Sequence, residues 1–302
     1  MSSFRAWLSA ARLRTLPLSV SGILVGTALA NFHGYHNTTV LILALLTTIG
    51  FQITSNFAND YGDGVKGTDN EDRIGPARAL QSGILDRRQL KKGIIYSIVI
   101  NLVLVMALLY TAFGIENLNY IFVFMALGAA SLWAAVRYTV GEGAYGYKGL
   151  GDVFVFIFFG LVAVLGTLFL FTSFLEYKAV FPAITIGLLS TAVLNLNNLR
   201  DLESDKRAKK NTLIVKLGLK NGKVYHYLLL IISFVSLFYF VFTEYNSWSN
   251  AICFLAYLPI LLHFRTVYSI KDPVLFDPEL KKLALSTFLL ALLFYIGYNN
   301  FL

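Results

Sequence analysis

The sequence predicts an all-α integral membrane protein with nine transmembrane helices. Composition is the first observation: 57% of the 302 residues are hydrophobic and 14% are charged, whereas a soluble domain carries about 25% charged residues. The apolar residues also form nine separate segments, each near the ~20 residues that a spanning helix needs. Finally, Lys and Arg gather in alternate connections between these segments. We therefore expect residues 1–302 to form a single polytopic membrane domain rather than two soluble domains.

The first element is an amphipathic segment at residues 1–14. Phe4, Trp7 and Leu8 fall on one helical face, with arginines around them, which indicates a helix lying in the membrane interface. A cleaved signal peptide is the alternative, because the Ala-Leu-Ala sequence at 28–30 resembles a cleavage site. The charged region before the apolar run is long for a signal peptide, so the interfacial helix is favoured.

Nine apolar segments of membrane-spanning length follow the amphipathic segment. They are expected at residues 16–32, 38–59, 93–113, 118–138, 151–173, 179–199, 224–243, 249–268 and 282–300. Most of the 25 Phe and 17 Tyr are expected to face lipid or the membrane interface, and some could line a pocket for an apolar chain or stabilise a carbocation.

The basic residues predict the orientation of the chain. Three lie before the first apolar segment, seven in 60–92, two in and beside 139–150, eight in 200–223 and four in 265–282, and the other connections hold only Lys178. By the positive-inside rule, the N-terminus faces the cytoplasm and the C-terminus the opposite side. Fourteen of the 17 acidic residues share the cytoplasmic face, so the polar chemistry is expected there. Basic residues placed in loops beside acidic ones argue against nucleic acid as a partner.

Two Asp-rich stretches are expected at the cytoplasmic ends of helices two and six. The first contains Asn56, Asp60 and Asp63, and the second contains Asn197, Asp201 and Asp205. Side chains three or four residues apart share one face of a helix, so each stretch presents its oxygen atoms together. Four helices separate the two stretches, a spacing that suits a ring of helices in which the stretches face one another.

The paired stretches predict a Mg²⁺ site that also takes a diphosphate. Mg²⁺ binds oxygen ligands and usually takes one or two carboxylates together with substrate phosphates. We expect Asp60, Asp63, Asp201 and Asp205 to be its ligands and the catalytic residues, with Asn56 and Asn197 as neutral oxygen donors. The alternative is that these are ordinary helix-end carboxylates paired with nearby Lys and Arg. Two copies at matching positions favour the metal, and a cation also offsets the unfavourable placement of carboxylates at a helix C-terminus.

Basic residues inside dense polar motifs are candidates to bind phosphate oxygens. They are Arg73 and Arg78 in the 72–78 stretch and Lys148 in the glycine-rich 141–151 loop. That loop is no nucleotide-binding fingerprint, because it joins two apolar segments and lacks Gly-x-Gly-x-x-Gly. Asp152 could be a favourable N-terminal residue of a helix or a functional residue, and the sequence favours neither role. The four histidines show no metal or catalytic pairing, and Cys253 has no evident role.

Together these motifs resemble the UbiA superfamily of intramembrane aromatic prenyltransferases. The matches are Arg14 to Ser19, Asn-x-x-Asn-Asp-x-x-Asp-x-x-x-Gly-Thr-Asp at 56–69, Arg-x-Gly-Pro-x-Arg at 73–78, Gln81-Ser82-Gly83, Tyr145 to Asp152 and Asn197 to Thr212. The Gly67-Thr68-Asp69 ending resembles the branch that prenylates 1,4-dihydroxy-2-naphthoate and makes demethylmenaquinone. Where that branch reads Gly-Lys-x-Thr, this chain reads Lys209-Lys210-Asn211-Thr212, which leaves the role of residue 209 open.

The resemblance implies nine transmembrane helices with the site at the cytoplasmic face of a bacterial inner membrane. It implies Mg²⁺ as cofactor, and polyprenyl diphosphate and an aromatic acid as substrates, beside membrane lipid; no feature indicates an obligate protein partner. By resemblance, the four aspartates carry Mg²⁺ bound to the diphosphate. The expected substrate-binding residues are Asn56, Asn59, Asp69, Arg73, Arg78, Lys148, Asn197 and Arg200.

Two alternatives to the naphthoate reaction remain open. The acceptor could be 4-hydroxybenzoate, homogentisate or a tetrapyrrole, all used within the superfamily. From a different class, the chain could be a cation-coupled transporter with the aspartates as its ion path. A transport path needs polar groups at mid-membrane, and the confinement of the acidic residues to one face argues against it.

Overall fold

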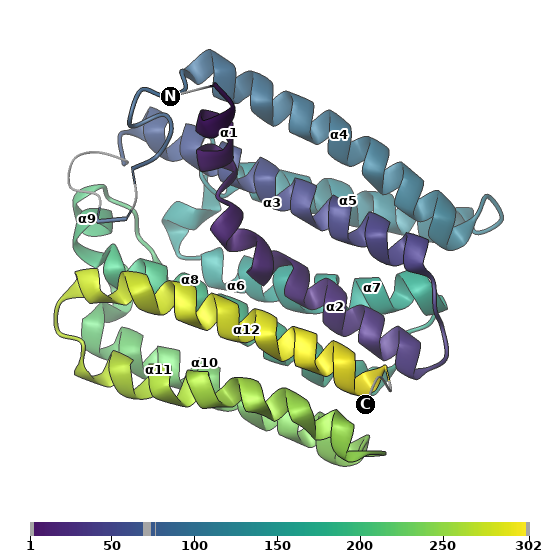
Figure 1. The fold of residues 1–302 in the computed structure, drawn as a ribbon. Helices are drawn as coiled ribbons and strands as arrows, with labels where there is room; N and C mark the ends of the chain where they lie inside the picture. The colour runs from purple at the N-terminus through teal and green to yellow at the C-terminus, as the bar shows by residue number, and fades with distance from the viewer. Residues whose placement is uncertain (1–2, 69–73, 76, 300–302) are drawn as a thin grey trace.

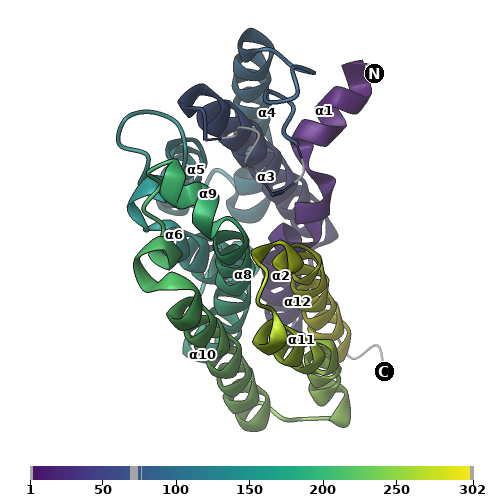
Figure 2. The ribbon, with the colours of Figure 1, turned by 90° about the vertical axis from the view of Figure 1, so that its left-hand side faces the viewer.

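The computed structural model describes residues 3–68, 74–75 and 77–299, and within them the secondary structure is entirely helical. In this part of the chain, nine helices are long and apolar enough to cross a membrane, which confirms the predicted fold class. They run side by side as one bundle (Figure 1). Viewed from one end, the helices form a ring that the chain closes by bringing α12 beside α2 (Figure 2).

Twelve α-helices make up the bundle. They are α1 (Ser3–Ala11), α2 (Leu16–Phe32), α3 (Thr38–Lys66), α4 (Arg87–Phe113), α5 (Leu118–Arg137), α6 (Gly151–Val155), α7 (Ala163–Thr172), α8 (Val180–Arg200), α9 (Leu202–Arg207), α10 (Leu213–Thr243), α11 (Tyr257–Ser269) and α12 (Phe276–Tyr298). A π-helical stretch, η3 (Phe156–Val162), joins α6 to α7 into one span, and 3₁₀ turns lie at η1 (Leu13–Thr15), η2 (Tyr145–Lys148), η4 (Tyr177–Ala179), η5 (Trp248–Ala256) and η6 (Pro273–Leu275).

Several helices extend beyond the apolar segments that predicted them. α3 continues to Lys66 and stops at Gly67, whose backbone is left-handed at φ 72°, a conformation that favours glycine at a helix end. α10 begins near Thr212, whose hydroxyl accepts a hydrogen bond from the Val215 amide, and bends at Gly218. Capping residues rather than hydropathy set these ends. The first Asp-rich stretch therefore lies in the part of α3 that extends past the apolar region, and the second lies just before the extended start of α10.

The amphipathic segment predicted at residues 1–14 forms α1 and the turn after it. Ala6 and Ala10 are buried, whereas Phe4 is 71% exposed and points away from the bundle. Trp7 packs edge-on against Phe57 of α3 with ring centroids 5.3 Å apart. α1 therefore lies against the end of α3, with an apolar side chain left free to enter a lipid interface.

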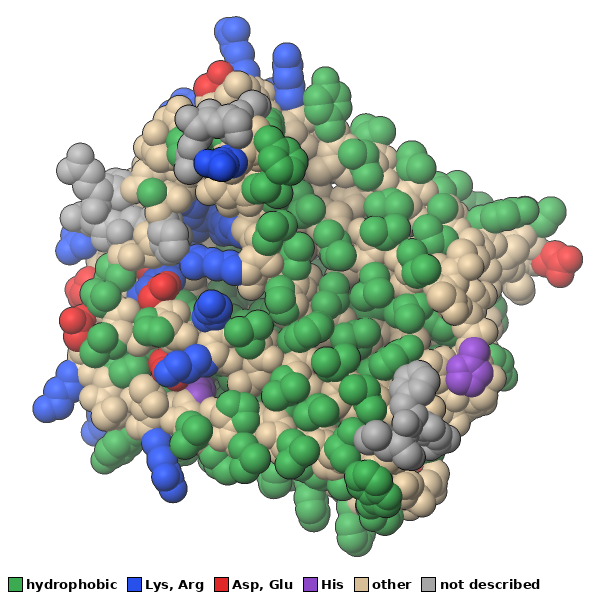
Figure 3. All heavy atoms as spheres, viewed as in Figure 1, with side chains coloured by type: hydrophobic (Ala, Val, Ile, Leu, Met, Phe, Trp, Pro, Cys, Tyr) green, Lys and Arg blue, Asp and Glu red, His purple; other side chains and the backbone are tan. Residues whose placement is uncertain are grey.

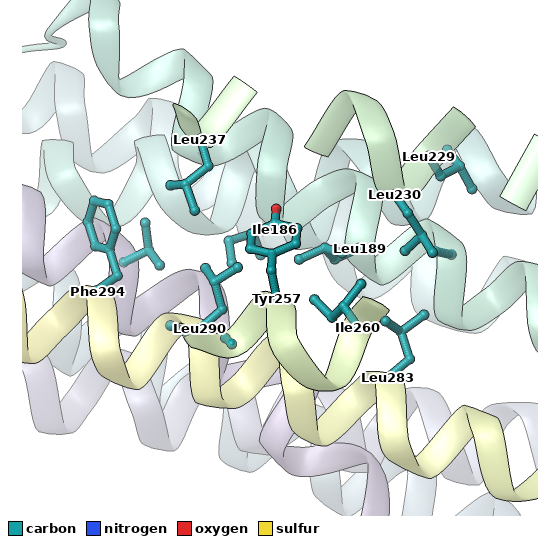
Figure 4. Close-up of a cluster of buried hydrophobic side chains, with 14 of the residues drawn as sticks. Ile186, Leu189, Leu229, Leu230, Leu237, Tyr257, Ile260, Leu283, Leu290 and Phe294 are labelled. Atoms are coloured by element: carbon teal, nitrogen blue, oxygen red, sulfur yellow. The ribbon is translucent and has the colours of Figure 1, made fainter. Parts of the chain in front are cut away.

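The core of the bundle lies mainly among α2, α7, α8, α10, α11 and α12. Ile186, Leu189 and Leu290 belong to this core, and Figure 4 shows them converging between the helices with Tyr257. Glycines allow the closest approaches: a Cβ atom added at Gly26 would lie 2.5 Å from the Val164 carbonyl oxygen. These closely packed helices form a rigid support that holds the C-terminal end of α8 in place.

Charged side chains concentrate at one end of the bundle, which we call the polar end. It comprises residues 60–68, 77–92, 138–150, 200–212 and 265–282 of the described chain. Figure 3 shows Lys, Arg, Asp and Glu gathered there around a hollow, whereas hydrophobic side chains cover the middle of the same face. An apolar belt of this kind is the surface expected of a protein that sits in lipid.

Candidate active site

The two Asp-rich stretches adopt different backbone conformations. Asp60 and Asp63 lie in the last turns of α3, as the helical spacing predicts. The second stretch crosses a helix break, because α8 ends at Arg200 and α9 begins at Leu202, which leaves Asp201 between them and Asp205 inside α9. All four carboxylates are at least nine-tenths buried, so each needs a cation or hydrogen-bond donors around it.

Lys210 connects the two stretches. Its ammonium nitrogen lies 3.7 Å from Asp205 Oδ1, and it also attracts Asp63 across the site. Burial by itself disfavours the ammonium form, but Asp63 and Asp205 outweigh burial and raise the pKa of Lys210 above its usual value. One buried positive charge thus stands between a carboxylate of each stretch, as a bound metal cation would.

Tyr147 completes this cluster from the glycine-rich loop. Its hydroxyl donates to Asp63 Oδ1 at 2.7 Å and lies 2.6 Å from the Thr68 hydroxyl oxygen. Burial and the Asp63 charge raise the pKa of Tyr147, so it remains a neutral donor. Its carbonyl oxygen accepts from the Asn211 amide at 3.1 Å, which ties the glycine-rich loop to the loop that carries Lys210. We call Asp63, Asp205, Lys210, Tyr147 and Arg78 the carboxylate cluster; Arg78 Nη2 lies 3.4 Å from Asp63 Oδ2.

Asp60 and Asn56 make contacts within the protein. Asp60 accepts hydrogen bonds from the backbone amides of Ala79 (3.0 Å) and Leu80 (3.3 Å), which fastens the turn after residue 77 onto α3. The Asn56 amide donates to the Ala11 carbonyl oxygen at 2.8 Å and so holds the end of α1. These contacts support the site from outside, and a metal or substrate role for either residue stays a prediction.

Asp201 and Arg200 form a second buried group. The guanidinium of Arg200 binds both carboxylate oxygens of Asp201 at 2.8 Å and also pairs with Asp277 at the start of α12. The side-chain oxygen of Asn197 accepts from the same guanidinium at 2.9 Å. Arg200 is 1% exposed, so it holds the end of α8 against α12, and its predicted contact with substrate stays a prediction.

The remaining predicted residues occupy varied positions. Asn59 Oδ1 lies 3.3 Å from the Thr139 hydroxyl and faces a pocket. The side chain of Lys148 is exposed, and its carbonyl oxygen accepts from Lys216. Asp152 lies in the first turn of α6, and its carboxylate accepts a hydrogen bond from the Tyr225 hydroxyl. Asp69 and Arg73 lie outside the described residues.

An elongated apolar pocket opens next to the carboxylate cluster. It lies between α2, α3, α4, α5 and the span formed by α6, η3 and α7. Asn59, Tyr138 and Tyr145 line its polar end, whereas Leu108 and Leu170 line it deep in the bundle. A pocket of this shape suits a long hydrocarbon chain whose polar head stays at the carboxylate cluster.

The donor atoms fit Mg²⁺ bound jointly with a phosphate. Within the described residues, no three Asp, Glu, His or Cys side chains lie close enough to hold a metal alone. Asp63 and Asp205 instead supply one carboxylate from each stretch, and Mg²⁺ commonly takes one or two carboxylates with substrate phosphates and water. The cluster can therefore accept a hydrated cation together with a diphosphate.

Comparison with known proteins decides the family. The sequence profile of the UbiA prenyltransferase family matches residues 19–275. The chain belongs to this family. It is 43% identical to the 1,4-dihydroxy-2-naphthoate octaprenyltransferase of Haemophilus influenzae, over 97% of this chain and 95% of that protein. It is 42% identical to the enzyme of the same name from Escherichia coli K12, over 98% and 96% of the two chains.

Solved structures of the UbiA family share the fold. The apo structure of a UbiA homolog from Aeropyrum pernix K1 has a TM-score of 0.70 at 15% identity, over 95% of this chain and 97% of that one. A UbiA homolog from Archaeoglobus fulgidus, bound to GPP and Mg²⁺, has a TM-score of 0.60 at 15% identity, over 96% and 99%. At this identity the likeness concerns the fold alone.

Sequence reasoning missed Tyr138 and Tyr147, and it left open the role of Lys210, one of several bases that could bind phosphate oxygens. Tyr147 lies in the glycine-rich loop, where the sequence pattern indicated roles only for the lysine and the glycines. Two of the four histidines lie together in the core of the C-terminal half. The Nε2 atoms of His226 and His263 are 2.9 Å apart, and His263 Nδ1 contacts the Glu279 carboxylate. This buried group joins α10, α11 and α12 and lies outside the carboxylate cluster.

Proposed function

We propose that this chain transfers a polyprenyl group from polyprenyl diphosphate to 1,4-dihydroxy-2-naphthoate and releases the carboxyl group as CO₂. The product is demethylmenaquinone, a menaquinone precursor. The observation that carries this proposal is the identity of 42–43%, over nearly the full length, to two proteins named for this reaction. An apolar pocket whose polar end, at Asn59 and Tyr138, lies beside the carboxylate cluster supports it.

The residues of the site act on three parts of the reaction. Mg²⁺, held by Asp63 and Asp205 with Asp60 and Asp201 as further candidates, would neutralise charge on the diphosphate. Lys210 and Arg78 add fixed positive charge at the same place, which favours departure of the diphosphate with the electron pair of the C–O bond. The apolar pocket holds the chain and excludes water, so the allylic carbon meets the aromatic ring rather than a hydroxyl.

The membrane orientation is part of the proposal. The polar end carries most of the basic residues of the described chain, and by the positive-inside rule we infer that it faces the cytoplasm of a bacterial inner membrane. Both substrates' charged groups would then enter from the cytoplasm, while the prenyl chain enters the pocket from the bilayer.

A purified-protein assay tests the proposal. The protein in detergent or liposomes is incubated with octaprenyl diphosphate, 1,4-dihydroxy-2-naphthoate and Mg²⁺, and the lipid product is identified by mass. We expect demethylmenaquinol or its oxidised form, and complete loss of product when a chelator removes Mg²⁺. Prenylation of 4-hydroxybenzoate in preference to naphthoate would contradict the acceptor, and ion flux in liposomes without any prenyl transfer would contradict the enzyme class.

Filling the apolar pocket at Gly128 is expected to select shorter prenyl chains. A Cβ atom added there has its nearest neighbours at 3.7 Å or more, so a larger side chain can enter the pocket without displacing a helix. Gly128 lies about 15 Å along α5 from Tyr138, and a geranyl chain is expected to end before it. We expect Gly128→Leu to lower kcat/KM for octaprenyl diphosphate about 10-fold or more, with a smaller effect on geranyl diphosphate.

Val123→Leu is the matched control for the pocket substitution, because Val123 lies on the same helix and is 56% exposed on the outer surface. It should leave the preference between the two chain lengths unchanged. An equal loss for both chain lengths in Gly128→Leu would contradict this placement of the prenyl chain.

A further inference from the structure

A second cavity lies at the end of the bundle opposite the polar end, and we call it the outer pocket. The connection between α2 and α3 lies there beside the C-terminal end of α12 (Figure 1). Among the residues that line the outer pocket are Thr27, Asn31, Thr38, Leu41, Phe171 and Asn299. Its volume is about 180 Å³. Sites for whole drug-sized ligands begin near ~300 Å³, so the outer pocket suits one ring system of a larger ligand.

The lining of the outer pocket is polar but lacks strong charges. No Lys, Arg, Asp or Glu is among the described residues that line it. The Asn31 side-chain amide of α2 instead donates to the side-chain oxygen of Asn299, and each amide nitrogen carries a second hydrogen. Leu41 and Phe171 add apolar area. Such a lining can donate hydrogen bonds to a neutral carbonyl compound, whereas a phosphate would lack the Lys or Arg that usually binds it.

Thr27 gives the outer pocket a buried hydroxyl that needs a partner. Thr27 is 1% exposed, and its Oγ1 makes no hydrogen bond within the described residues. Thr38 is exposed by contrast, so Thr27 lies at the floor of the pocket and Thr38 at its mouth. Leaving a buried hydroxyl without a partner costs free energy. A ligand with a carbonyl oxygen would accept the missing hydrogen bond.

The outer pocket lies directly beyond the deep end of the apolar pocket. On α2, Ile23 lines the apolar pocket, and Thr27, about one turn further along the helix, lines the outer pocket. On α7, Leu170 lines the apolar pocket and the next residue, Phe171, lines the outer one. A ligand whose ring fills the outer pocket can therefore extend an apolar tail into the apolar pocket, from the end opposite the carboxylate cluster.

We propose that the outer pocket binds the ring of a prenylquinone, with the Thr27 hydroxyl donating to a quinone carbonyl oxygen and the prenyl tail lying in the deep end of the apolar pocket. The choice of ligand rests on the proposed function, because a prenylquinone is the oxidised form of that reaction's product. A long prenyl diphosphate reaches the same deep end from the polar side. The two ligands therefore compete, and accumulated quinone lowers the binding of the substrate.

Binding of tritiated menaquinone-4 to the protein in phosphatidylcholine nanodiscs tests the inference without any turnover. We expect saturable binding in the presence of excess phospholipid, which excludes the phospholipid as the preferred ligand. Thr27→Val should raise the Kd about 5-fold, as expected for the loss of one neutral hydrogen bond. Thr27→Ser keeps the hydroxyl and should bind like the wild type.

Competition between ligands tests the shared deep end. Octaprenyl diphosphate should displace menaquinone-4, whereas geranyl diphosphate, whose chain is expected to end before Gly128, should not. Displacement by neither compound would overturn the overlap of the two tails. Equal displacement by both would also overturn it, because the quinone would then lie near the carboxylate cluster.

Ser190→Ala is the matched control. Ser190 of α8 is also 1% exposed, its hydroxyl has no hydrogen bond within the described residues, and it lines neither pocket. It should leave the Kd unchanged. Absence of saturable binding, or equal Kd values for Thr27→Val and Ser190→Ala, would overturn the inference. A protein that prenylates naphthoate but fails this test leaves the proposed function standing, whereas quinone binding without prenyl transfer counts against the proposed function alone.

Discussion

Asp63→Asn and Asp205→Asn are each expected to lower Mg²⁺-dependent prenyl transfer at least about 10²-fold. The two carboxylates come from opposite stretches of the chain, and both attract the single ammonium group of Lys210. They therefore face one shared position for a cation. Because they serve the same metal–diphosphate unit, the double variant should be little worse than either single variant. Initial rates over a range of Mg²⁺ concentrations measure both effects.

Glu203→Gln provides the matched control for the aspartate variants. Glu203 lies on α9 two positions before Asp205, but it is exposed and pairs with Lys206 on the surface. Its loss should leave the rate and the Mg²⁺ requirement near wild type. Fully multiplicative losses in the double variant would indicate that Asp63 and Asp205 act in separate sites and would contradict the shared position.

Hydropathy predicted the spans but not where the helices end. Apolar length alone marks what lies in the bilayer, whereas α3 and α10 continue through charged residues until a cap or glycine stops them. The second Asp-rich stretch shows the opposite error. Its regular spacing suggested one continuous helix, yet the chain breaks at Asp201. Helical spacing gives the direction of side chains only while the helix persists.

The sequence predicted which residue types make up the candidate site, but few of the contacts between them. Spacing placed Asp63 and Asp205 in matching motifs, and the ring of helices brings both to Lys210. The spacing did not predict that the backbone amides after residue 78 donate hydrogen bonds to Asp60, because such a contact depends on the path of a loop rather than on periodicity. Tyr138 had no motif to mark it, and only the tertiary structure places it between pocket and charge.

Arg200→Met is expected to destabilise the protein by about 3–5 kcal/mol. The substitution keeps a long side chain but leaves Asp201, which is 7% exposed, without the guanidinium that binds both its oxygens. It also removes the ion pair to Asp277 that joins α8 to α12. Breaking a buried pair from one side costs more than the pair contributes, because the remaining charge stays buried. Thermal unfolding in a single detergent measures the loss.

Two further variants test whether the loss of stability comes from the buried charge that is left unpaired on Asp201. Lys206→Met removes a cation of the exposed pair with Glu203 and should change stability by about 1 kcal/mol or less. Adding Asp201→Asn to Arg200→Met should recover part of the lost stability, since the stranded charge is then neutral. If Arg200→Met unfolds at the wild-type temperature but binds prenyl diphosphate poorly, Arg200 serves the substrate rather than the fold. A loss of stability that Asp201→Asn relieves would instead make Arg200 the support that holds α8, and with it the second Asp-rich stretch, in place.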